Sequence, residues 1–211
     1  RRRCRPKERR RRHSLPELEE ASGWLAEENK SAEVVKMVTS LSDFFRTTLS
    51  KGHDYITVKE ERTHIESYLE IQQFRYQDIL DYEIQMDEEI YGYIIPKLTL
   101  QPLVENALYH GIKNKRGKGK ILITGKKQGD KIIFQVIDNG KGMTEEELNS
   151  LRKKMAGTDT GDEAKGFGVS NVNQRIKYYY GEEYGVFFES KENEGTNATI
   201  IIAAKNIQLP S

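Results

Sequence analysis

The apolar positions of the chain follow a helical spacing in its first third and an alternating, strand-like spacing further on. From Ser31 to Leu49, apolar residues recur every three or four positions; Ser31 suits a helix N-cap and Gly52 suits a stop. A second stretch, TVKEERTHIESYLEIQQFRYQDIL, starts at Thr57 and gives Thr57 and Glu60 the spacing of a capping box. The two apolar stripes consist of Val34, Val38, Leu41, Phe45 and Leu49, and of Val58, Ile65, Leu69 and Ile79.

Two amphipathic helices with a short connection predict a helical hairpin, and one hairpin cannot bury both of its apolar stripes. A second copy of the chain would complete a four-helix bundle, so this pattern predicts a homodimer. The alternative is that the stripes pack against the remainder of the same chain.

From Leu80 onward, the pattern predicts strands mixed with helices. LDYEIQM alternates like a strand, and residues 98–110, which follow Pro96, predict a helix. KILITGKK and KIIFQVID, separated by QGD, predict a β-hairpin, and TEEELNSLRKKM predicts a short helix capped by Thr144. A helix near 169–180 and two strands, GVFFES and NATIIIAAK, complete the series. This order predicts an α+β fold in which helices cover one face of a mostly antiparallel sheet.

The charge distribution separates an amino-terminal segment from the rest of the chain. Residues 1–12 hold nine basic residues and one acidic residue, so the remainder carries a net charge of −7 against +1 for all 211 residues. This segment either contacts an anionic surface or is a solvated, disordered or non-native leader. It lacks interleaved aromatic residues, so nucleic acid is not expected as a partner.

The single cysteine, Cys4, excludes an internal disulfide and favours a reducing compartment. No apolar stretch approaches the roughly 20 residues of a membrane-spanning helix, so no membrane segment is expected in this chain.

Four short stretches carry the candidate chemistry. They are LQPLVENALYHG at 100–111, DNGKGM at 138–143, GFGVSN at 166–171 and EGTNATI at 194–200. Each alone is a weak signal, since DNG after a strand is usually a turn and GFG before a helix is usually loop punctuation. Together, and in this order, they resemble the ATP-binding domain shared by histidine kinases, type II topoisomerases, Hsp90 and MutL.

The first of these stretches is most similar to sensor histidine kinases of the LytS/YesM-like branch. LSDFFRTTLSKG and YITVKEERTHIESYLEIQQFRY also resemble the segments before the ATP-binding domain in that branch. The resemblance implies a helical hairpin that dimerises into a four-helix bundle, followed by a two-layer α/β sandwich. The implied division is a basic leader at 1–22, the hairpin at 23–80, the ATP-binding catalytic domain at 81–206 and a tail at 207–211.

The resemblance also implies a function. The chain would be the cytoplasmic catalytic core of a two-component sensor histidine kinase whose parent protein is anchored in a membrane. Such a core binds ATP and Mg²⁺, works as a homodimer, transfers the γ-phosphoryl group to a histidine and passes it to a response regulator. The alternative is an ATP-binding signalling module without autokinase activity. A GxxxxGK[ST] sequence is absent, so the chain is not a P-loop enzyme.

The resemblance assigns base-binding residues to the second and fourth stretches. Asp138 is expected to accept a hydrogen bond from the exocyclic amine of adenine. Gly140 and Gly142 are expected to let the backbone approach the base closely. Thr196, which follows Gly195 in the last stretch, is expected to support the pocket from a strand.

The first stretch is expected to hold the metal and part of the phosphate chain. Asn106 is the implied ligand of Mg²⁺, for which one neutral oxygen suffices because the ion keeps several waters and binds mainly through phosphates. Glu105 is expected to orient Asn106 or a metal-bound water. His110, one turn beyond Asn106, either contacts phosphate or ribose or has a capping or surface role.

Positive charge for the phosphates is expected from an unusual position. Many family members carry Lys or Arg where this chain has Tyr109, so Lys113 or Lys115 is expected to substitute. Residues 156–167 are expected to form a mobile lid over ATP. The helix that follows offers unpaired N–H groups to phosphate oxygens. The residues expected to bind there are Gly166, Gly168 and Asn171.

The phosphate-accepting histidine is the least well matched part of the resemblance. Extending the family pattern from GWLAEENK places His13 at the acceptor position, where only His13 and Leu15 match. Pro16 would fit only the first turn of a helix. His13 is therefore an acceptor in an altered context, a coincidence in a foreign leader, or a surface histidine. His53 and His64 lie in the inter-helix connection and inside the second helix, so they are poorer candidates.

Overall fold

The residues that the computed structural model describes are 31–49, 54–115, 117–156 and 167–205. By their contacts, the residues of the chain form two compact units, 1–39 and 40–211, and only 31–39 of the first are described. The predicted leader at 1–22 and tail at 207–211 lie outside the described residues.

Two helices come first. α2 (Ser31–Leu49) has the predicted bounds. α3 (Val58–Arg75) begins with the predicted capping box. The Thr57 hydroxyl accepts from the Glu60 N–H at 3.2 Å, and the Glu60 carboxylate accepts from the Thr57 N–H at 2.7 Å.

The carboxyl end of α3 differs from the prediction. The helix ends at Arg75, and Ile79, which was predicted on its apolar stripe, lies in a turn closed by its N–H bond to the Tyr76 carbonyl at 3.0 Å. Leu80 then opens a strand opposite Gly119. The Gly119 N–H donates to the Ile79 carbonyl at 2.8 Å, an acceptor that a longer helix would have used.

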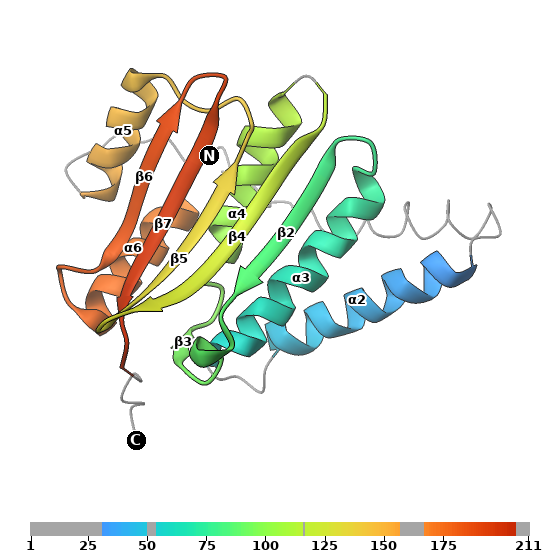
Figure 1. Cartoon of the computed structure of the whole chain (residues 1–211), viewed down its shortest axis with the longest axis horizontal. Helices are drawn as coiled ribbons and strands as arrows, with labels where there is room; N and C mark the ends of the chain where they lie inside the picture. Colours follow the sequence, from blue (N-terminus) through green and yellow to red (C-terminus); the bar gives the residue numbers. More distant parts are fainter. Residues whose placement is uncertain (1–30, 50–53, 116, 157–166, 206–211) are drawn as a thin grey trace, which may run out of the picture. The chain divides into compact units, whose positions relative to one another are not determined.

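A five-stranded sheet forms the centre of the unit 40–211 (Figure 1). The described strands are β1 (Tyr55–Thr57), β2 (Leu80–Met86), β3 (Ile94–Pro96), β4 (Gly119–Gln128), β5 (Lys131–Asp138), β6 (Gly185–Lys191) and β7 (Gly195–Ala203). The order in the sheet is β2-β4-β5-β7-β6, in which β2 and β4 are parallel and the other three pairs are antiparallel. The predicted mostly antiparallel sheet is confirmed. β1 and β3 form a separate antiparallel pair.

Helices cover one face of this sheet. The remaining helical elements are 3₁₀ turns (Glu88–Ile90, Ile112–Asn114), α4 (Gln101–Asn106), a π-helical turn (Ala107–Gly111), α5 (Glu145–Met155) and α6 (Phe167–Tyr180). α4 and α6 lie behind the sheet in the view of Figure 1. Along β5, Ile132, Phe134 and Val136 are buried while the residues between them are partly exposed, as expected for a strand with one covered face. The predicted two-layer α/β sandwich is confirmed.

The helix predicted at 98–110 is shorter and less regular than expected. It begins only at Gln101, because Leu98 has a positive φ of 58° that no α-helix contains. After Asn106 the α-helical turn widens into the π-helical turn. That turn brings Gly111 against the carboxylate that ends β5, and such turns are frequent at functional sites.

α3 packs into the core of the sheet-containing unit. Val58, Ile65 and Leu69 have no exposed surface and belong to the same hydrophobic cluster as Phe134. The stripe of α3 is thus buried within this chain, in agreement with the second of the two packings that the sequence left open. The homodimeric four-helix bundle remains a prediction.

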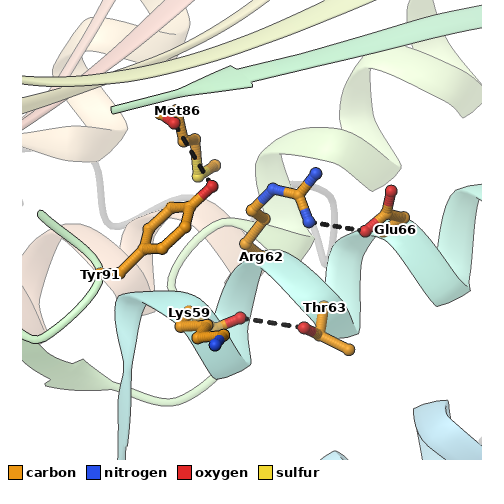
Figure 2. A network of polar contacts seen from close by, with 6 residues as sticks. All are labelled: Lys59, Arg62, Thr63, Glu66, Met86 and Tyr91. Atoms are coloured by element: carbon orange, nitrogen blue, oxygen red, sulfur yellow. Dashed lines mark hydrogen bonds and ion pairs between the residues drawn. The ribbon is translucent and has the colours of Figure 1, made fainter. Parts of the chain in front are cut away.

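The outer side of α3 carries polar contacts, which Figure 2 shows. Arg62 pairs with Glu66 at 2.8 Å, and the Thr63 hydroxyl donates to the carbonyl one turn earlier at 3.1 Å. Nearby, the Tyr91 hydroxyl donates to the Met86 carbonyl at 3.4 Å. A partly exposed ion pair at this spacing contributes only about 0.3–0.5 kcal/mol, so the buried side of α3 contributes most of its stabilisation.

Removal of a ring with no exposed surface tests this core. Phe134→Ala is expected to lower the free energy of unfolding by about 3–5 kcal/mol, because the side chain has no exposed surface. Phe187→Ala on β6 is the matched control; its side chain is 49% exposed, and a loss below about 1 kcal/mol is expected. Urea unfolding followed by circular dichroism measures both, and equal losses would contradict this assignment of the core.

Candidate nucleotide-binding site

A pocket of about 210 Å³ opens between α4, its π-helical extension and the ends of β5, β6 and β7. The polar side chains that line it are those of Asn106, His110, Asp138 and Thr196. Its apolar walls are formed by Leu103, Val136, Met143, Leu151, Phe188 and Ala198. Residues from three of the four stretches singled out in the sequence thus meet at one cavity.

Asp138 is the buried acid of this pocket. It ends β5 and is only 5% exposed. Burial raises the pKa of Asp138 to about 6, although N–H groups of Gly140 and Thr196 and the charge of Lys115 act in the opposite direction. The Gly140 N–H donates to Oδ1 at 2.8 Å. A buried acceptor with remaining lone pairs is well suited to a ligand that brings a hydrogen-bond donor.

Gly111 is part of the site and was missed by the sequence reasoning. A Cβ atom at this position would lie 2.5 Å from Asp138 Oδ1, so a larger residue would have to displace the carboxylate. The Gly111 carbonyl also accepts from the Lys141 N–H at 3.2 Å. The sequence feature that could have indicated Gly111 is its place directly after the polar residues of a helical run. Gly142, which was predicted, has a φ of 65° and lines the pocket.

Ser190 is a second residue that the sequence did not indicate. Its hydroxyl lies 2.9 Å from the Thr196 hydroxyl and accepts from the Met143 N–H at 2.9 Å. It also donates to the Gly195 carbonyl at 2.9 Å. β6 thereby ties the loop after β5 to β7, which keeps the predicted Thr196 and the apolar Met143 in place.

Glu105 faces away from its neighbour Asn106. The side-chain amide of Gln101 donates through Nε2 to the Glu105 carboxylate at 2.8 Å, and its Oε1 lies 2.6 Å from His64 Nε2. Burial raises the pKa of Glu105. The expected polar pair is therefore divided: Asn106 lines the pocket, and Glu105 belongs to a hydrogen-bonded series with α3.

His64 is fully buried on the other side of that series. Its ring stacks on Phe44 with centroids 4.6 Å apart, and burial lowers its pKa, which favours the neutral ring. The buried position is in keeping with its low ranking as a phosphate acceptor. His13, the favoured candidate, lies outside the described residues.

The other predicted phosphate contacts lie apart from the pocket walls. Lys113 Nζ stands over the rings of Tyr109 and Tyr76, 4.8 and 5.1 Å from their centroids. The charge of Lys115 acts on the Asp138 carboxylate, and its Nζ donates to the Asn139 carbonyl at 2.6 Å. Gly168 and Asn171 are exposed near the start of α6. Gly166 and most of the predicted lid fall outside the described residues.

The donor set bears on the kind of metal the site could hold. Within the described ranges, no group of three or more His, Cys, Asp or Glu side chains is arranged to hold a metal ion. Asn106 offers one neutral amide oxygen at the edge of the pocket. This fits Mg²⁺ bound mainly through phosphates and does not fit a cage built from protein ligands alone.

Comparison with known families agrees with this architecture. Residues 96–206 match the family described as histidine kinase-, DNA gyrase B-, and HSP90-like ATPase. The chain belongs to this ATPase family. Residues 18–80 also match the histidine kinase family, and this segment includes the two helices α2 and α3.

Several curated relatives of this chain are named as sensor proteins. Sensor histidine kinase YesM of Bacillus subtilis is 34% identical over 194 residues, which are 92% of this chain and 32% of that protein. Sensor protein LytS of Staphylococcus saprophyticus is 29% identical, over 82% of this chain and 29% of its own length. The chain thus spans about a third of the length of the relatives it matches.

Solved structures show the same fold. The catalytic domain of histidine kinase ThkA superposes with a TM-score of 0.54 at 19% identity, covering 73% of this chain and 97% of that domain. The mycobacterial sensor histidine kinase MprB gives a TM-score of 0.51 at 16% identity, over 74% of this chain and 99% of the other.

The raised pKa of Asp138 has a consequence for stability. The same carboxyl in the unfolded chain titrates near 3.8, so folding disfavours its ionised form. The stabilisation of the folded chain by the protonated Asp138 carboxyl is complete below about pH 4 and is lost as the pH rises through about 6. Asp138→Asn is therefore expected to gain up to about 3 kcal/mol relative to the unmodified chain between about pH 4 and pH 7. Urea unfolding of both chains at each pH measures this, and parallel pH curves would contradict it.

Proposed function

We propose that the chain is the catalytic core of a two-component sensor histidine kinase, which binds Mg·ATP and transfers its γ-phosphoryl group to a histidine. The observation that carries the proposal is the buried Asp138 carboxylate in an apolar-walled pocket that Asn106 also lines. Membership of the ATPase family and the similarity to sensor histidine kinases support it.

Adenine is the part of the nucleotide that suits the pocket. Its exocyclic amine would donate to Asp138, while Met143, Leu151 and Phe188 provide apolar contact for a flat ring. A cavity of about 210 Å³ is smaller than the roughly 300–1,000 Å³ of drug-sized ligand sites, which fits one ring system with its phosphates outside.

The phosphates would extend past the edge of the pocket that Asn106 and His110 form. Asn106 would hold Mg²⁺, which supplies neutralisation of the phosphate charge when it is bound. Lys115 is the better placed of the two candidate lysines to add positive charge. Gly166, Gly168 and Asn171 are proposed to bind phosphate oxygens from α6 and the segment before it.

Phosphoryl transfer would depend mainly on positioning and charge neutralisation. A nitrogen of the accepting imidazole forms the new bond to phosphorus as the bond to the departing ADP oxygen breaks. His13 is the proposed acceptor, from which the group passes to an aspartate of a response regulator. Glu105 binds Gln101 on the side of α4 that meets His64, so the pocket-lining Asn106, and not Glu105, is proposed to act at the metal.

The assembly and location are part of the same proposal. We propose a homodimer and a cytoplasmic position within a membrane-anchored parent, as the names of the relatives as sensor proteins suggest. None of the helices that the structure describes has the length and apolar composition needed to cross a bilayer.

A second candidate is a nucleotide-binding signalling module without kinase activity. The observation that favours it is the altered sequence around His13, RRRRHSLPELEEASG, in which only His13 and Leu15 match the expected acceptor pattern. The two candidates share the ATP pocket and differ in whether the chain becomes phosphorylated.

Loss of the carboxylate tests the ATP pocket. Asp138→Asn is expected to weaken binding of a non-hydrolysable ATP analogue at least about tenfold, because a hydrogen bond to a charged group is worth about 1.5–3 kcal/mol. Titration calorimetry with Mg²⁺ present measures the change. Asp130→Asn, the same change at an exposed residue directly before β5 and at the opposite end of that strand, is expected to bind within about threefold of the unmodified chain. Undiminished affinity in Asp138→Asn would overturn the assignment.

The acceptor is tested by labelling with γ-³²P ATP. His13→Gln is expected to abolish acid-labile phosphate on the protein and to leave nucleotide affinity unchanged, because the imidazole of His13 is the proposed acceptor and is not one of the residues proposed to bind the nucleotide. His53→Gln is the matched control and is expected to label normally. Unchanged labelling of His13→Gln would remove His13 from the role. Nucleotide binding without any labelling of the unmodified chain would favour the non-kinase module.

A further inference from the structure

A fully buried carboxylate from α3 holds the turn that precedes α4. Glu61 has no exposed surface; its Oε1 accepts from the Leu100 N–H at 2.7 Å and its Oε2 from the Leu98 N–H at 3.0 Å. The first N–H groups of a helix lack partners within the helix, and the N-cap residue here is Leu100, whose side chain has no acceptor. In a capping box the N–H of the N-cap residue binds the side chain of residue N3, which here is the apolar Leu103; Glu61 supplies that acceptor from a different helix.

The same turn is held from the other side by α6. Arg175 Nη2 donates to the Leu98 carbonyl at 3.2 Å, and the charge of its guanidinium favours the ionised form of Glu61. Leu98 itself has a φ of 58°, a conformation that a leucine keeps only when its surroundings impose it. Three elements, α3, α6 and the start of α4, thus meet at one buried turn.

We propose that Glu61 is a positioning residue for the nucleotide site, which sets the place of Asn106 relative to Asp138 by fixing the start of α4. The inference rests on the proposed function of the pocket. Asn106 is on α4, one to two turns beyond the turn that Glu61 holds. Asp138 is on β5, which is held by pairing with β4 and β7. Loosening the turn would therefore move the metal ligand and leave the base-binding carboxylate in place.

The hydrogen bonds that Glu61 accepts from Leu98 and Leu100 depend on the charge of its carboxylate. The ionised carboxylate accepts from both N–H groups, whereas the protonated form carries an O–H on one oxygen and loses an acceptor position. Burial raises the pKa of Glu61 to about 7, while the N–H groups of Leu98, Thr99 and Leu100 and the charge of Arg175 act in the opposite direction. Within the described part of the chain, Arg175 is the charged group that faces it, with Asp54, Tyr55 and Tyr179 around the guanidinium. His64, one turn along α3, binds Gln101 instead.

The test compares Glu61→Gln with Glu60→Gln, the same charge change on the neighbouring residue, whose carboxylate binds the Thr57 N–H. Dissociation constants are measured for the Mg²⁺ complex of a non-hydrolysable ATP analogue and for adenosine in EDTA. At about pH 8.5, Glu61→Gln is expected to weaken the Mg²⁺ complex about tenfold, the lower end for groups that orient metal ligands. Its effect on adenosine should stay below about twofold, as for independent sites. Glu60→Gln should change neither constant.

The pH profile separates positioning by charge from a general structural defect. Glutamine resembles the protonated glutamate, so Glu61→Gln and the unmodified chain should bind the Mg²⁺ complex equally at about pH 5.5. The ratio of their dissociation constants should rise as the pH passes through about 7. Comparison at each pH cancels the titration of the nucleotide and of other residues. A ratio that does not change with pH would overturn the proposal.

Two further measurements keep the test decisive. In the nucleotide-free chain, amide hydrogen exchange of Leu98 and Leu100 should be faster in Glu61→Gln than in Glu60→Gln, and equal rates would overturn the proposal. If Glu61→Gln does not fold, Arg175→Gln replaces it; it removes the bond to the Leu98 carbonyl and should also weaken the Mg²⁺ complex more than adenosine. Equal weakening of both ligands by the folded variant would overturn the inference.

Failure of the inference differs from failure of the proposed function. An unmodified chain that binds no adenine nucleotide, or binds it independently of Asp138, overturns both. Normal binding that requires Asp138 but is unchanged in Glu61→Gln at every pH overturns the inference alone.

Discussion

A carboxylate withdrawn from water at the end of β5 shapes the candidate site. Two backbone N–H groups only partly offset the desolvation of Asp138, which leaves its pKa raised to about 6. The space around it is so restricted that Gly111 has no room for a side chain. Apolar walls from α5 and β6 complete an enclosure that favours a flat ligand with a donor edge. All of these features surround the buried Asp138 carboxylate.

α4 connects that enclosure to α3. Asn106 and His110, four residues apart, lie on the side that lines the pocket, whereas Gln101 and Glu105, with the same spacing, lie on the side that meets His64. A helix of six residues has little stability of its own, so its position depends on what holds its ends. The π-helical turn against Asp138 holds one end, and the buried Glu61 holds the other.

Patterns among neighbouring residues predicted a large part of the fold. The capping boxes at Thr57 and Thr144 depend on residues three positions apart, and the alternation of β5 depends on its period of two, so each is visible in a short stretch of sequence. The ordered set of four stretches similarly indicated Asn106 and Asp138, because the family resemblance lies in those letters and their order.

Long-range packing accounts for the remainder. Residues that are distant along the chain meet at the pocket and at the turn before α4. Gly111 approaches Asp138, Lys113 is held over Tyr76 and Glu61 binds Leu100, and no periodicity within a single segment contains these contacts. The early end of α3 and the divided roles of Glu105 and Asn106 have the same origin. Local sequence specifies which conformation each segment prefers, whereas the pairing of buried polar groups, most of which require partners, determines where the segments meet.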